Sequence, residues 1–188
     1  MYTVHMKPFR FSPIKDKAQL FEAIEYIHFE SYRLCKKILG DFLPAAGNIG
    51  VFCHYDDECE RLIKIRKELT DLSDNWNQKY FRLHKPIVIP AKNDVPETTY
   101  TYLYIRRPEA SNSYVGDVDF YLEPNKYKEL KESLLSGNLI KGAEVFKRPD
   151  LDLIKLYDSD SDVTAFIGKK TMAENVENLW YHPNDKNI

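Results

Sequence analysis

The sequence has little glycine, few cysteines and no long apolar run: its 188 residues include 7 glycines and 3 cysteines. No apolar segment approaches the ~20 residues that a membrane-spanning helix needs, so we expect no membrane partner. The opening MYTVHMKPFRF lacks the apolar core and cleavage site of a secretory signal. An odd number of cysteines (Cys35, Cys53 and Cys59) without a signal predicts unpaired thiols in a reducing compartment. The expected location is therefore cytoplasmic.

A strong charge of one sign is also missing. Lys and Arg total 27 and Asp and Glu total 29, with no long basic block. Since nucleic-acid binding depends on concentrated positive charge, we expect no nucleic-acid partner. Tyrosine (13) and phenylalanine (10) are abundant, which favours a sheet-bearing globular protein. The length favours one compact body.

The most chemically loaded stretch is residues 98–122, TTYTYLYIRRPEASNSYVGDVDFYL. It predicts two strands joined by a polar loop. Because side chains alternate between the faces of a strand, Tyr100, Tyr102, Tyr104 and Arg106 are expected on one face. In the second strand, Gly116–Leu122, alternation places two aspartates and a tyrosine together. If both strands belong to one sheet, tyrosines, an arginine and two carboxylates share a surface.

This surface predicts a binding site for a small polar or anionic molecule. Arg106 is the expected anchor, since a guanidinium grips a carboxylate or phosphate bidentately. The tyrosines would supply walls and hydroxyl donors. No cofactor and no metal are predicted. The expected lining residues are Tyr102, Tyr104, Arg106, Asp117, Asp119, Tyr121 and His84.

The remaining pattern predicts an α+β fold. A long helix over residues 15–39 begins at a capping box of Asp16 and Gln19 and ends at Gly40. Three elements precede the tyrosine-rich strand: a strand (48–54), a helix (57–72, with Asp57 and Glu60 as its capping box) and a strand (80–89), in which Pro86 marks an edge or a bulge. After Leu122 we expect a helix beginning at Pro124 and ending near Gly137, and strands at 143–146, 151–157 and 163–167, the last two forming a hairpin. A short helix from Thr171 to Trp180 closes the chain.

Two similar short segments divide the chain into repeated units. Residues 47–52 (GNIGVF) resemble residues 116–121 (GDVDFY), and a helix and further strands follow each. We therefore predict an N-terminal arm and helix (1–46) and two βαββ(β) repeats, 47–109 and 110–188. Together these form a curved mixed or antiparallel sheet. The layout is similar to the vicinal oxygen chelate proteins, which build a ligand cleft between curved half-barrels; a ferredoxin-like layout is the alternative. The resemblance implies a cleft. The His and Glu metal ligands of those enzymes are not found here.

Two other functions remain open. The Asp117–Val118–Asp119 strand, a following helix and a later strand carrying Asp150 and Asp152 resemble the metal-binding frame of nucleotidyltransferases. That resemblance implies a divalent metal on Asp117, Asp119 and Asp152, although Ile105 and Arg106 stand where the family has Gly-Ser. Alternatively, the tyrosine-rich surface is an interface to a protein partner or a homodimer.

Overall fold

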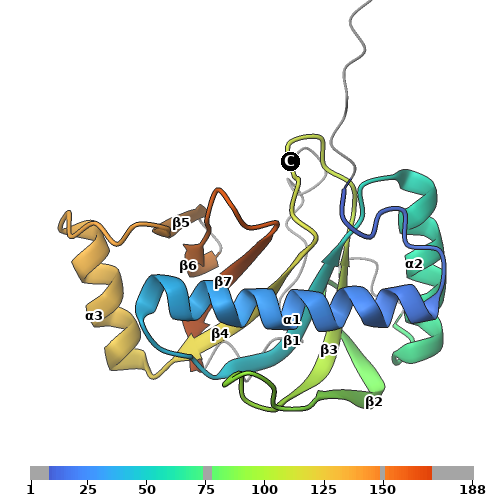
Figure 1. Cartoon of the computed structure of the whole chain (residues 1–188), viewed down its shortest axis with the longest axis horizontal. Coiled ribbons are helices and arrows are strands. Elements are labelled where there is room, and N and C mark those ends of the chain that lie inside the picture. The colour runs from blue at the N-terminus through green and yellow to red at the C-terminus, as the bar shows by residue number, and fades with distance from the viewer. Residues whose placement is uncertain (1–8, 74–77, 149–150, 171–188) are drawn as a thin grey trace, which may run out of the picture.

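The computed structural model describes residues 9–73, 78–148 and 151–170 and has a mixed α+β fold, as predicted. A single seven-stranded sheet is covered by helices (Figure 1). In chain order the elements are α1 (Lys17–Leu39), β1 (Ala45–Phe52), α2 (Asp56–Leu69), β2 (Phe81–Ile89), β3 (Thr98–Arg106), β4 (Gly116–Leu122), α3 (Pro124–Leu135), β5 (Ala143–Arg148), β6 (Leu151–Leu156) and β7 (Val163–Lys169). The predicted C-terminal helix and Asp150 lie outside the described residues.

The sheet has the strand order β2-β3-β1-β4-β7-β6-β5. β1 runs parallel to β3, β4 runs parallel to β7, and β1 and β4 pair antiparallel at the centre. The tyrosine-rich strand β3 and the aspartate strand β4 therefore share one sheet, with β1 between them. β6 and β7 form the expected antiparallel pair. The repeat suggested by the sequence stays a prediction.

The first helix begins and ends where its sequence indicates. The side chain of Asp16 accepts a hydrogen bond from the Gln19 backbone N–H at 2.9 Å, and Gln19 accepts one from the Lys15 N–H. Gly40 ends the helix at φ +80°, where a side chain would be strained. The second helix differs from prediction: Tyr55 precedes it without a side-chain cap, so the expected box of Asp57 and Glu60 is wrong.

The three helices of the described residues all lie on one face of the sheet. α1 crosses the centre, flanked by α2 on one side and α3 on the other (Figure 1). Its buried Leu20, Ile24 and Ile27 share one apolar core with side chains of β1, β3, β4, β6 and β7 and with Tyr127 of α3 and Leu62 of α2. No described helix is long and apolar enough to cross a membrane.

The alternation of side chains in β3 is interrupted part-way along the strand. The prediction that all its tyrosines share one face is therefore wrong. Tyr100 belongs to the helix-side core, where its hydroxyl lies 2.9 Å from Nδ1 of the buried His28 in α1. Tyr104 belongs to a separate aromatic cluster with Phe52 and Tyr80. The neighbouring strands shift register around this point, between Ala45 and Ile49 in β1 and between Arg82 and Ile87 in β2. Because of this irregularity, the tyrosines of β3 do not all share one face.

Candidate functional site

The sheet face away from the helices, which we call the carboxylate face, brings polar side chains of three adjacent strands together. The register aligns Gly50 of β1 with Tyr104 of β3 and Asp117 of β4. The residues between these positions, such as Val51 and Val118, point into the helix-side core. Alternation then places the following side chains on the carboxylate face: Asn48, Phe52, Tyr102, Tyr104, Arg106, Asp117 and Asp119. Arg106 and the two aspartates thus share a face, as the sequence predicts.

Asp117 is the most buried carboxylate of this cluster, with 6% of its surface exposed. The backbone N–H of Gly50 donates a hydrogen bond to its carboxyl group. Glycine is needed at that position, because a Cβ atom at Gly50 would lie 2.1 Å from Asp117 Oδ1. Burial, and secondarily the charge of Asp119, raise the pKa of Asp117 to about 7, although Lys79 and Arg106 counteract them. Asp117 can therefore exchange a proton near neutral pH.

Asp119 is held by two donors from distant segments. The Tyr80 hydroxyl donates to Asp119 Oδ2 at 2.8 Å, and the Asn48 Nδ2 donates to the same oxygen. Loss of hydration raises the pKa of Asp119, and Lys79 together with these two hydrogen bonds limits the rise. The carboxylate is thereby fixed in position beside Asp117.

Two cations accompany the carboxylates, and both are already engaged. The Lys79 ammonium lies 4.7 Å from the centre of the Tyr104 ring and 5.2 Å from that of Tyr80. The Arg106 guanidinium lies 4.9 Å above the Phe52 ring and bonds to Glu109. Among the described residues the cluster therefore contains three carboxylates, Glu109 included, against two cations, so these residues supply no excess of positive charge to attract an anion.

One buried polar atom at this site has no partner among the residues that the structure describes. Asn48 is 1% exposed, and while its Nδ2 bonds to Asp119, its Oδ1 makes no hydrogen bond within the described part of the chain. An unsatisfied buried acceptor costs about 1–3 kcal/mol, so such atoms are uncommon in folded proteins. An incoming hydrogen-bond donor would remove this cost.

Replacing Tyr80 by phenylalanine should lower the free energy of unfolding by about 2 kcal/mol at pH 8, because the hydrogen bond to an ionised Asp119 is lost without leaving room for water. The loss should shrink at pH 4, where Asp119 is increasingly protonated. Urea unfolding at both pH values measures it. Tyr55→Phe, whose ring is exposed, is the matched control and should cost little. Equal costs for the two variants would contradict this role of Tyr80.

One predicted lining residue makes its contact elsewhere. His84 has an exposed ring whose Nε2 lies 3.3 Å from Asp71, because the bridge between Thr70 and Leu83 holds Asp71 beside β2. Tyr121 is half-buried near the end of β4, two positions beyond Asp119. His84 therefore does not join the cluster, and the inclusion of Tyr121 stays a prediction.

The predicted three-carboxylate metal site is wrong. Asp152 of β6 lies on the helix side of the sheet, where Tyr127 and Lys131 donate to its Oδ1 at 2.9 and 2.7 Å and Lys169 lies 2.8 Å from its Oδ2. Burial alone would raise the pKa of Asp152, but these hydrogen bonds outweigh it and hold the pKa below its usual value. Within the described residues no cluster of three or more His, Cys, Asp or Glu side chains could hold a metal ion.

The tyrosine-rich strand is also not an aromatic surface ready for a partner. Tyr100 is fully buried and Tyr104 is 5% exposed, packed against Phe52 and Tyr80. Tyr102 is half-buried. A partner docking on this strand would find mainly side chains that already fill the protein interior.

Comparison with known proteins adds information on the fold. The solved structure described as "Structural Genomics, Protein EC4020" superposes with a TM-score of 0.54 at 18% identity, covering 92% of this chain and 97% of that one. The likeness shows the fold alone. Neither a protein-family model nor a curated protein matches the chain.

Solved structures of methylmalonyl-CoA epimerase are more distant. A Streptomyces coelicolor enzyme in complex with 2-nitronate-propionyl-CoA has a TM-score of 0.32 at 16% identity, covering 68% of this chain and 97% of that chain. A methylmalonyl-CoA epimerase in complex with methylmalonyl-CoA and NH4+ has a TM-score of 0.30 at 15% identity and covers 68% and 94%. At these scores the ligands of the epimerases carry no information about this chain.

Sequence reasoning missed three residues of the site, Asn48, Lys79 and Tyr80. Asn48 had a usable signal, because it is a strongly polar residue opening the apolar run IGVF. Lys79 and Tyr80 had none, since they precede β2 and reach Asp119 only through the tertiary fold.

Proposed function

We propose that the chain binds a small polar molecule at the carboxylate face, and that this molecule donates hydrogen bonds through amine, amide or hydroxyl groups. The observation that carries the proposal is Asn48 Oδ1, a buried acceptor without a partner in the described chain, beside Asp117 and Asp119. A donor placed there would satisfy Asn48 and would also meet a fixed carboxylate.

The anionic ligand predicted from Arg106 has less support. Arg106 is bonded to Glu109 and stacked on Phe52, so an anion would have to displace an existing ion pair. It would also approach Asp117 and Asp119. A donor-bearing ligand, neutral or cationic, meets no such penalty, because charges of opposite sign and unpaired acceptors favour it.

A thermal-shift panel tests the proposal, with isothermal titration calorimetry to follow. Small amines, amidines and polyols form one arm, organic anions and phosphate a second, and Mg²⁺ or Mn²⁺ with ATP a third. Ligand at ten times its dissociation constant stabilises the folded protein by about 1.4 kcal/mol, enough for a measurable rise in melting temperature. We expect stabilisation by members of the first arm only.

Matched variants locate the binding. Asp119→Asn keeps the shape of the side chain but removes the charge, and Asn48→Leu removes the unpaired acceptor; both should abolish the shift. Asp152→Asn makes the same chemical change on the other face and should leave the shift intact. A shift with anions alone would favour Arg106 as the anchor instead. A shift that survives in Asp119→Asn would contradict the proposed location.

A further inference from the structure

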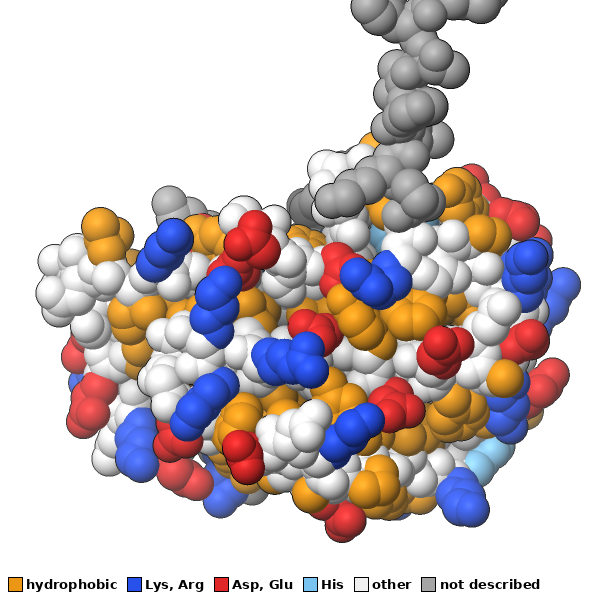
Figure 2. Space-filling model, viewed as in Figure 1, with side chains coloured by type: hydrophobic (Ala, Val, Ile, Leu, Met, Phe, Trp, Pro, Cys, Tyr) orange, Lys and Arg blue, Asp and Glu red, His pale blue; other side chains and the backbone are white. Residues whose placement is uncertain are grey.

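The outer face of α1, opposite the side that packs on the sheet, borders an open cavity of about 640 Å³. Aromatic side chains line it from three segments: Tyr26 and Phe29 on the helix, Phe11 before it and Phe42 after it. Figure 2 shows this face, where hydrophobic side chains lie between acidic and basic ones. An outer helix face is ordinarily polar. These four rings are half-buried and pack partly against the core, so the edges that remain at the border of the cavity are what a protein partner would contact.

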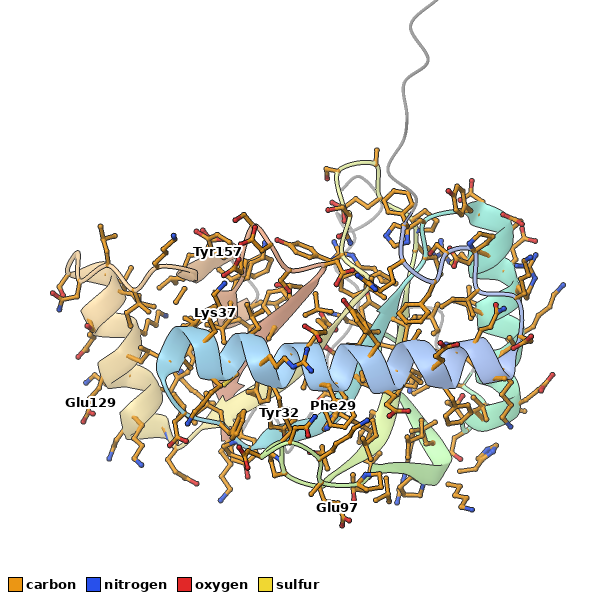
Figure 3. All side chains as sticks on the ribbon, in the orientation of Figure 1. Phe29, Tyr32, Lys37, Glu97, Glu129 and Tyr157 are labelled. Atoms are coloured by element: carbon orange, nitrogen blue, oxygen red, sulfur yellow. The ribbon has the colours of Figure 1, made fainter. Side chains whose placement is uncertain are left out.

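Charge along this face is separated by sequence. Glu22 and Glu25 border the cavity in the first half of α1. Arg33, Lys36 and Lys37 border it in the second half, together with one acidic residue, Glu30, which pairs with Arg33. Phe29 lies midway between Glu22 and Lys36, and also midway between Glu25 and Arg33. Figure 3 shows Phe29 and Lys37 at opposite edges of the helix.

This order of charges is complementary to itself when reversed. A second α1 laid antiparallel across the first, with the two Phe29 side chains at the centre, places Glu22 and Glu25 of each copy opposite Arg33 and Lys36 of the other. A parallel arrangement would put like charges together. An antiparallel contact of this kind has a two-fold axis through its centre, the commonest symmetry of protein dimers.

The charges available for such a contact differ in their present partners. Arg33 pairs with Glu30 of its own helix at 2.5 Å, and Lys37 pairs with Asp158. Lys36 lies 3.9 Å from Asp41, at the limit of an ion pair, and its side chain is half exposed. Glu22 and Glu25 are exposed and make no hydrogen bond or ion pair within the described residues. The acidic half is therefore the less satisfied one.

We propose that two copies of the chain associate through the outer faces of α1 in an antiparallel, two-fold arrangement. The aromatic side chains form the centre of the interface, and the acidic and basic halves of the helices fix its direction. This interface lies on the opposite side of the sheet from the carboxylate face and does not depend on the proposed ligand. Either proposal can fail without the other.

Charge-reversal variants with sedimentation equilibrium test the dimer. Wild type should change from monomer to dimer mass as its concentration rises. Glu22→Lys with Glu25→Lys makes the face basic throughout, and Arg33→Glu with Lys36→Glu makes it acidic. For each double variant alone, the dissociation constant of the dimer should rise at least about tenfold, because like charges meet across the interface. An equimolar mixture should recover dimer mass, since the basic face of one variant now meets the acidic face of the other.

The mixing experiment distinguishes association of two copies from binding of a different partner at the cavity. Exchanging the exposed pair Lys128 and Glu132 of α3 is the control and should leave dimerisation unchanged. Thermal unfolding of each variant checks that it is folded. A wild type that stays monomeric at every concentration would overturn the proposal and leave the cavity to a different partner. Double variants that dimerise as well as wild type, or a mixture that does not recover, would overturn it as well.

Discussion

Replacing Gly116 by alanine should lower the free energy of unfolding by about 3 kcal/mol or more. A Cβ atom there would lie 2.2 Å from the carbonyl oxygen of Gly50 and 2.5 Å from Cδ1 of Ile27. The isoleucine can rotate away, but the carbonyl belongs to β1, which is held between β3 and β4. The two central strands must therefore separate locally, which weakens the pairing that joins the two halves of the sheet.

Urea unfolding followed by circular dichroism measures this loss, and Gly40→Ala is the matched control. Gly40 has φ +80°, and a Cβ atom added there would meet no other atom within 4 Å, so its replacement costs only backbone strain, about 1 kcal/mol. Ile27→Val in the Gly116→Ala background removes the Cδ1 contact and should recover little. A full recovery would mean that the side chain, and not the β1 carbonyl, sets the cost.

The effect of Gly116→Ala should extend to the carboxylate face. Gly50 contributes the carbonyl that the new methyl group meets, and its N–H bonds to the Asp117 carboxyl. That hydrogen bond lowers the pKa of Asp117, so a displaced Gly50 that weakens it should let the pKa rise further in the variant. Glycine at positions 50 and 116 therefore allows the close pairing of β1 with β4 and also the hydrogen bond to Asp117.

The elements could be predicted because their signals are local. The cap of α1, the edge strand with Pro86 and the β6–β7 hairpin each depend on residues close in sequence. The site could be predicted in part, because Arg106, Asp117 and Asp119 alternate regularly within two strands. Their common face depends on the register of both strands with β1, which lies between them.

The predictions that were wrong, and the site residues that were missed, depend on how separate segments are placed relative to one another, which no single segment of the sequence contains. Alternation tells which residues of one strand share a face, but not which face that is relative to another strand. Alternation alone therefore allows Asp152 and Asp117 on one face, whereas the sheet separates their side chains. Tyr100 left the expected face because register shifts in neighbouring strands interrupt the alternation. Asn48 and Tyr80 meet Asp119 from 71 and 39 residues away, so only the fold brings them together.

Replacing Asp117 by asparagine should stabilise the protein at pH 8, by up to about 4 kcal/mol. The pKa of Asp117 is raised from 3.8 to about 7 in the folded chain, chiefly by burial and then by Asp119. Between these values the folded chain binds more protons at Asp117 than the unfolded chain does. The free energy of unfolding therefore falls as the pH rises from about 4 to 7, and the penalty is complete above 7. Asparagine keeps an acceptor for the Gly50 N–H and carries no charge, so this penalty disappears.

The difference between wild type and Asp117→Asn, measured by urea unfolding from pH 4 to 8, isolates this effect from His28. Burial lowers the pKa of His28 from 6.5 to about 4, so the stability it contributes is present above pH 6.5 and is lost as the pH falls toward 4. That slope opposes the one from Asp117 and partly hides it in wild type, but it is common to both proteins and cancels in the difference. Asp152→Asn makes the same change where lysines hold the pKa low, so it should destabilise at neutral pH. Opposite signs for the two substitutions would show that Asp117 is kept at a cost to stability, as expected of a residue retained for binding; a pH-independent difference would contradict the raised pKa.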